Sequence, residues 1–218
     1  RRMAQVAHDG GAKIALQIVH AGINSGYLQR QGITALAVSR TPEVARPHRE
    51  MTDEEVEAII GDFASAAARA VEAGFDGVQL HGAHGYLMSQ FASPLYNTRN
   101  DRWGGNAENR RRFHLEVIKR IRQTVGADYP LMIKFGVQDD REGGLSLSEG
   151  VETCRQMAEA GIDSIEISAG FGSPIQVVKD GDPERAYFRD RAAAVKRAVS
   201  VSVMVVGGIR SLETSQSI

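Results

Sequence analysis

Two phrases of the chain, EAGFDGVQL and EAGIDSIEI, follow one pattern: the end of a helix, a glycine, an aspartate and then an apolar strand. Further apolar, β-rich runs occur at 14–19, 131–135 and 203–206, and stretches with helical periodicity lie between them. Strands that are separated by helices run parallel, with right-handed crossovers and the helices outside the sheet. The sequence therefore predicts an α/β protein built from a repeated strand and helix.

The sequence also marks where helices begin. Thr52 and Glu55 have the spacing of a capping box, in which the threonine oxygen and the glutamate carboxylate satisfy free backbone amides of the first helical turn. Ser146 and Glu149 repeat this spacing, and Asn106 can cap another helix between them. These signals fit the helices that the strand pattern requires.

A repeated strand and helix can form a doubly wound sheet or a (β/α)8 barrel. The dinucleotide-binding version of the first needs a Gly-x-Gly-x-x-Gly turn after an early strand, and the sequence contains none. Polar or small residues instead stand where one strand after another ends: Gln17, His20, His81, Lys134, Ser168, Gly207 and Gly208. A barrel brings such strand ends to one mouth.

The length of the chain limits how much of a barrel it can form. A full barrel typically needs ~250 residues and eight strands, whereas the chain has 218 residues and five clear strand patterns. We therefore expect a partial (β/α)8 TIM barrel, with about five of the eight βα units. We expect a single domain over residues 1–218, truncated at both ends.

Charge, hydropathy and cysteine content indicate which partners and which compartment to expect. The chain has 26 basic and 27 acidic residues, so its net charge of −1 gives no reason to expect a nucleic acid or an anionic membrane as partner. No apolar run approaches the ~18 residues of a membrane span. Cys154 is the only cysteine, which fits a reducing compartment and predicts a cytoplasmic protein.

His81, His84 and Tyr86 lie within six residues of one another just after a strand. The two histidines can be packed or capping residues, or a metal pair, or two donors to one substrate oxygen. A metal pair needs a third ligand, and the segment has no Asp or Glu, so we expect no metal. If the segment turns into a helix, both imidazoles point the same way and Tyr86 is placed as a proton donor.

Three other strand ends carry groups that could bind a cofactor. The Gln17 amide has a donor and an acceptor, which suits a heterocycle with an imide edge. Lys134 lies in the apolar run LMIKF, so it must meet an anion or face a cavity. It could form a Schiff base or provide a fixed positive charge. Gly207 and Gly208 could cradle a phosphate or form a plain turn.

With these residues in place, the chain resembles the Old Yellow Enzyme family of NADH:flavin oxidoreductases over nearly its whole length. The resemblance begins with GGAKIALQIVHAG and ends with DSIEISAG and VVGGIR. Its longest and most specific part runs through HGAHGYLMSQFASPLYNTRNDRWGGNAENRRRF. The family consists of flavoenzymes on a (β/α)8 barrel, so the resemblance implies noncovalent FMN at the mouth of the barrel and NAD(P)H as the reductant.

The resemblance also implies roles for the cofactor-binding residues. Gln17 matches the glutamine that binds the pyrimidine edge of the flavin. Lys134 matches a basic position near the flavin N1 and C2 oxygen, although many members have arginine there, and the two cations differ in geometry. Gly207 and Gly208 match part of the phosphate loop.

For the substrate, the resemblance implies an enone or enal whose carbonyl is bound by His81 and His84. Hydride passes from the reduced flavin to the β-carbon, and Tyr86 protonates the α-carbon. Two alternatives stay open: an aldolase-type barrel that uses Lys134 as a Schiff-base lysine, and a barrel fragment that is not catalytically competent. A homo-oligomer is compatible with the sequence.

Overall fold

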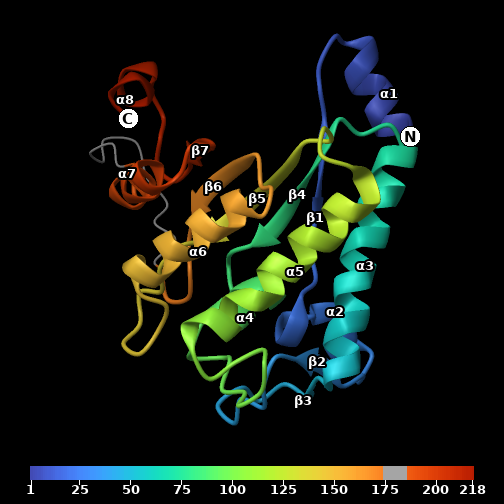
Figure 1. Ribbon diagram of the computed structural model, residues 1–218, viewed down its shortest axis with the longest axis vertical. Coiled ribbons are helices and arrows are strands. Elements are labelled where there is room, and N and C mark those ends of the chain that lie inside the picture. The colour runs from blue at the N-terminus through green and yellow to red at the C-terminus, as the bar shows by residue number, and fades with distance from the viewer. Residues whose placement is uncertain (174–185) are drawn as a thin grey trace.

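The core of the molecule is a parallel sheet of five strands in the order β1-β4-β5-β6-β7 (Figure 1). The computed structural model describes residues 1–173 and 186–218. The strands are β1 (Ala15–Ile18), β4 (Gly77–Gly82), β5 (Leu131–Gly136), β6 (Ser164–Ser168) and β7 (Ser202–Val205). All five strands predicted from the sequence are confirmed and differ only at their ends. Within this sheet the order follows the chain without the reversal of a doubly wound fold.

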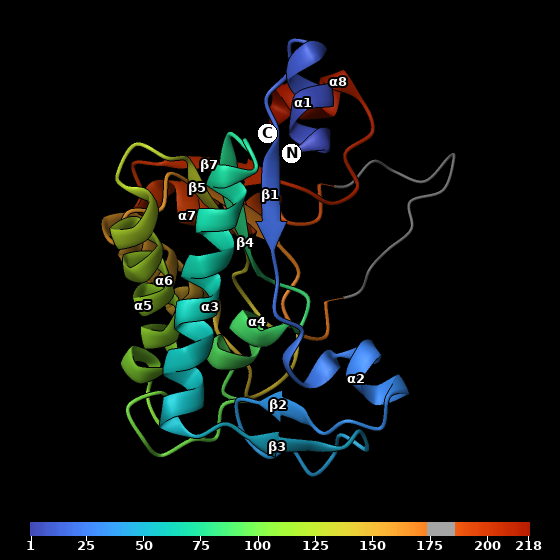
Figure 2. The same cartoon turned by 90° about the vertical axis from the view of Figure 1, so that its right-hand side faces the viewer.

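Helices cover one face of the sheet. The long helices are α1 (Arg2–Asp9), α3 (Asp53–Glu72), α5 (Ala107–Val125), α6 (Leu147–Glu159) and α7 (Arg189–Ala198). The short ones are η1 (Gly22–Asn24), α2 (Gly26–Arg30), α4 (Leu87–Ala92) and α8 (Leu212–Ser217). Helices α3, α5, α6 and α7 pack side by side on the same side of the sheet (Figures 1 and 2).

Alternate residues of each strand point to these helices. Apolar side chains fill the interface, and those of the central strands are fully buried: Val78, Leu80, Ile133, Phe135, Ile165 and Ile167. The intervening positions lie on the opposite face and are partly exposed in β5 and β6. The sheet therefore has an apolar face toward the helices and a more accessible face away from them.

Two of the predicted helix caps are confirmed and one is only half confirmed. Thr52 accepts from the backbone N–H of Glu55, whose carboxylate returns to the backbone of Thr52, as a capping box requires. Asn106 caps α5. Ser146 caps α6, but the carboxylate of Glu149 accepts a 2.6 Å hydrogen bond from Arg110 of α5. A charged donor on the neighbouring helix binds a carboxylate more strongly than a neutral backbone amide does.

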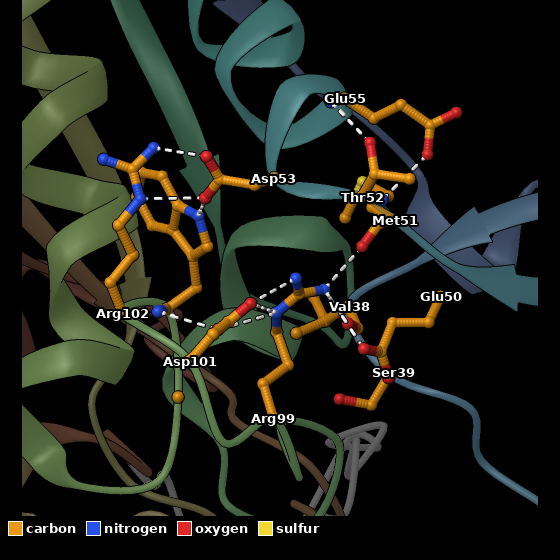
Figure 3. Close-up of polar contacts among 12 residues, drawn as sticks. Val38, Ser39, Glu50, Met51, Thr52, Asp53, Glu55, Arg99, Asp101 and Arg102 are labelled. Carbon is orange, nitrogen blue, oxygen red and sulfur yellow. Dashed lines mark hydrogen bonds and ion pairs between the residues drawn. The ribbon is translucent and has the colours of Figure 1, made fainter.

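A small side sheet, β2 (Ala35–Ala37) and β3 (His48–Glu50), was not predicted. Arg99, only 5% exposed, joins it to the loop after α4. One guanidinium nitrogen donates to the backbone carbonyls of Val38 and Met51, at 2.9 and 2.8 Å. The other two nitrogens bind the carboxylate of Asp101, as Figure 3 shows. This buried arginine ties three segments together beside the carboxyl ends of the strands.

Candidate active site

The accessible face of the sheet carries a continuous row of polar side chains. Gln17 of β1 donates to Gln79 of β4 at 2.6 Å, and Gln79 donates to Glu166 of β6 at 2.9 Å. Glu166 also forms an ion pair with Lys134 of β5, its neighbour in the sheet register. The structure thus brings two predicted residues, Gln17 and Lys134, into one hydrogen-bonded network.

Gln79 and Glu166 were not identified from the sequence. Lys134 was expected to meet an anion or face a cavity, and the anion is Glu166; the two side chains are 18% and 12% exposed. The signal for Glu166 was present, because an acidic residue inside the apolar run SIEIS needs a partner for the same reason as Lys134 does. Gln79 gave no comparable signal, since an uncharged amide is tolerated at a half-buried strand position.

His81 lies in β4 directly beside Lys134 in the register. The backbone N–H of Ala83 donates to its Nδ1 at 3.3 Å, so the proton of the neutral ring lies on Nε2. Burial, followed by the nearby His84 and Lys134, lowers the pKa of His81 to about 4. His81 is therefore a neutral hydrogen-bond donor at neutral pH.

His84 and Tyr86 surround the His81 ring. Their ring centroids lie 5.0 and 4.9 Å from that of His81, and both contacts are edge to face. The Nε2 atom of His84 is 2.8 Å from the hydroxyl of Ser168 on β6. Burial, followed by Lys134, also lowers the pKa of His84. Two neutral imidazoles and a phenol therefore meet at the carboxyl end of β4.

The backbone that carries them is not helical, so the condition under which a helix would point both imidazoles the same way is not met. His84 has a φ of +58°, in the left-handed region, and Gly85 follows with +74°. A Cβ on Gly85 would come within 2.7 Å of the Phe171 ring. The backbone N–H of His84 donates to the carbonyl of Ala169 at 3.1 Å. Contacts with the loop after β6 thus select a tight turn, and α4 begins only at Leu87.

Gly207 and Gly208 follow β7, and both have positive φ, +98° and +73°. A Cβ on Gly207 would lie 2.9 Å from the Tyr187 ring, so close packing alone accounts for glycine there. Within residues 1–173 and 186–218, no hydrogen bond or ion pair joins this turn to His81 or Lys134. The phosphate cradle and the plain turn both stay open, and the role of this pair stays a prediction.

Neither a cluster of metal ligands nor a membrane-spanning helix is found among the described residues. Within the described residues, no three His, Cys, Asp or Glu side chains are grouped so that they could hold a metal ion. In the same part of the chain, no helix combines the length and apolar character that crossing a membrane requires.

Known proteins are similar to this chain in sequence and in fold. A sequence model of the NADH:flavin oxidoreductase / NADH oxidase family matches residues 1–218. The NADH oxidase of Thermoanaerobacter brockii is 40% identical over 219 residues, which cover 99% of this chain and 34% of the relative. A 2-naphthoyl-CoA reductase, solved in complex with 2-naphthoyl-CoA, is 29% identical and matches with a TM-score of 0.83 over 92% of this chain and 33% of that one.

An old yellow enzyme homologue from Zymomonas mobilis matches with a TM-score of 0.78 over 98% of this chain and 61% of that one; at 23% identity it shows the fold alone. The partial (β/α)8 barrel predicted from the sequence is confirmed by the strand order and by both structural matches. The chain spans about a third of the length of the T. brockii protein.

Proposed function

The chain belongs to the NADH:flavin oxidoreductase / NADH oxidase family, and from this premise we propose that its polar sheet face holds FMN and that, with NAD(P)H as reductant, it reduces the activated C=C bond of an α,β-unsaturated carbonyl compound. Bound FMN would supply the two-electron chemistry that no amino acid side chain performs. The observation that carries the proposal is His81: a neutral Nε2 donor, flanked by His84 and Tyr86 and beside Lys134 in the sheet.

The residues on the polar face fit a flavin. Gln17 uses its amide nitrogen on Gln79, and no described residue donates to its carbonyl oxygen, which can accept from an imide N–H. Lys134 supplies the positive charge that an electron-rich ring needs, and its ammonium has donors beyond the one used on Glu166. The backbone amides at Gly207 and Gly208 are the groups that we assign to the phosphate.

His81 and His84 would bind the substrate carbonyl. A neutral imidazole donates a hydrogen bond to the oxygen and stabilises the negative charge that develops on it, without giving up its own proton. Both pKa values lie below the usual value for histidine, so both rings are in this form at neutral pH. The 2-naphthoyl-CoA reductase that matches this fold was solved with a conjugated carbonyl compound, which supports this class of substrate.

Tyr86 would then protonate the carbon next to the carbonyl. Because the two histidines keep their protons, the α-carbon needs a separate acid. The phenol of Tyr86, whose ring lies against His81, is chemically a stronger acid than the aliphatic hydroxyl of Ser168 beside His84.

The ion pair of Lys134 disfavours the aldolase alternative. A Schiff-base lysine must have its Nζ atom free to attack a carbonyl, whereas the Nζ atom of Lys134 is engaged with the carboxylate of Glu166. Borohydride reduction in the presence of an aldehyde or ketone, followed by mass spectrometry, tests this directly. We expect no covalent adduct on Lys134.

Reconstitution tests the main proposal. The purified protein, incubated with FMN and freed of excess cofactor, is expected to show a bound-flavin absorption spectrum and to oxidise NADH or NADPH faster when 2-cyclohexenone is added. Exchange of Tyr86 for phenylalanine should lower the rate of enone reduction by about 100-fold or more, the range of general acid catalysis, while the flavin is still reduced by NAD(P)H. A protein that takes up no FMN contradicts the proposal, and also supports the view of a chain that is not competent by itself.

A further inference from the structure

The turn from His84 to Tyr86 has a backbone shape that needs external support. His84 is the one residue other than glycine with a positive φ among residues 1–173 and 186–218. The left-handed region is unfavourable for a residue with a Cβ, and such residues persist when the surrounding structure holds them there. The structure shows what holds this one.

Two side-chain amides converge on the carbonyl of Gly85, in the middle of the turn. The Nδ2 atom of Asn24 donates to it at 2.8 Å, and the Nε2 atom of Gln90 donates to it at 2.7 Å. Asn24 comes from η1, after β1, and Gln90 comes from α4. The carbonyl between the proposed substrate-binding histidine and the proposed proton donor is therefore fixed from two sides.

Each of the two amides is held in turn. The Oδ1 atom of Asn24 accepts a 2.8 Å hydrogen bond from Arg46. Gln90 is 1% exposed, and its Oε1 accepts from the backbone N–H of Ile23. Gly22 leaves room for it, because a Cβ there would lie 2.4 Å from that oxygen. The orientation of both amides is thus defined, with each nitrogen toward Gly85.

We infer that Asn24 and Gln90 are positioning residues, which hold the strained turn so that His84 and Tyr86 face the same substrate. This inference rests on the proposed function for its kinetic consequence, but the mechanical part concerns the turn alone. Neither residue is expected to touch the substrate.

The sharpest test is Asn24→Asp. This variant keeps the oxygen that accepts from Arg46 but replaces the N–H donor with an oxygen that repels the Gly85 carbonyl. Gln29→Glu is the matched control, because it makes the same amide-to-carboxylate change at an exposed position of α2 nearby. Asn24→Ala removes the donor without repulsion and serves if the aspartate variant does not fold.

Amide hydrogen exchange of the folded protein is the first measurement. We expect exchange at His84 and Tyr86 to be at least tenfold faster in the Asn24 variants than in Gln29→Glu, with amides of β5 unchanged. The second measurement is enone reduction by the FMN-loaded protein, in which kcat should fall about tenfold, since small misplacements of reacting groups are costly. FMN affinity should stay the same.

The outcomes separate the two proposals. A wild-type protein that binds no FMN refutes the proposed function, while the exchange data still decide whether the amides hold the turn. If amide exchange at His84 and Tyr86 in the Asn24 variants stays within twofold of the control, Asn24 does not hold the turn. Faster exchange with an unchanged kcat in an active enzyme overturns the positioning role.

Discussion

The ion pair of Lys134 and Glu166 determines how much positive charge the polar face offers to a ligand. Glu166→Gln removes the compensating carboxylate and keeps the side chain's size. A reduced flavin is electron-rich, so the uncompensated ammonium should stabilise it. We expect the midpoint potential of bound FMN to rise by about 30 mV, which corresponds to about 1.4 kcal/mol for a two-electron couple. Spectroelectrochemical titration measures this.

A carboxylate far from the polar face supplies the control for that shift. Glu159→Gln makes the same chemical change at a side chain that is 63% exposed, and it should leave the potential where it is. An equal or lower potential in Glu166→Gln would mean that Lys134 does not face the flavin.

At the residue level, the sequence placed the candidate residues at strand ends but did not give their geometry. His81, His84, Tyr86, Gln17 and Lys134 all lie at or near strand ends as predicted, and side-chain contacts join them in two groups. The left-handed backbone of His84 could not be predicted, because it depends on Ala169, on a loop 85 positions later in the chain. The residues next to His84 in the sequence do not indicate that contact.

At the level of structural elements, Arg99 binds the residues that directly follow both strands of the side sheet. Arg99→Lys keeps the charge but loses the planar fork that serves Val38, Met51 and Asp101 at once. Because the Arg99 side chain is 4% exposed, the carbonyls of Val38 and Met51 that lose it cannot form hydrogen bonds with water instead. We expect the free energy of unfolding to fall by about 2–4 kcal/mol, in the range for breaking buried charged hydrogen bonds, as measured by urea denaturation.

Arg102 provides the comparison, since it also pairs with an aspartate but its side chain is 50% exposed. Arg102→Lys should cost less than about 1 kcal/mol, as surface ion pairs usually do. Similar losses in the two variants would show that burial does not set the strength of the Arg99 contacts.

The helices that the sequence predicted well are those with long periodic patterns. Helices α3 and α5 have such patterns and local caps. The five strands of the main sheet were found as short apolar, β-rich runs between the helices. The strands β2 and β3 are three residues each, too short for alternation to be detected. They pair with each other, and Arg99 binds the residue that follows each of them; both are long-range contacts that the local sequence does not indicate.

At the scale of the whole molecule, acid sensitivity should come in part from a histidine outside the site. His114 of α5 is fully buried between Phe113 and Phe135. Burial lowers its pKa to about 4, although the backbone of Met88 opposes part of the shift. The unfolded chain binds a proton near pH 6.5 and the folded chain does not. The contribution of His114 to the free energy of unfolding is therefore complete above pH 6.5 and is lost as the pH falls toward 4.

His114→Phe removes this titration and suits the aromatic surroundings. Stability at pH 7 should stay similar, because apolar replacement of a buried polar group is often neutral. Between pH 6.5 and 4, the variant should lose about 3 kcal/mol less than the wild type, from the size of the pKa shift. Denaturation curves at several pH values measure the difference, and parallel losses would contradict the assignment.

The alternation of the strands has a consequence for how such a protein can change over evolutionary time. Lys134 and Glu166 lie on one face, and their immediate neighbours Ile133 and Ile165 lie on the other. Point substitutions on the polar face can therefore alter chemistry while leaving the hydrophobic interior intact. A single-residue insertion within a strand would exchange the two faces and damage both. New specificities on this scaffold should accumulate by replacement within strands, and length variation should be confined to the loops between them.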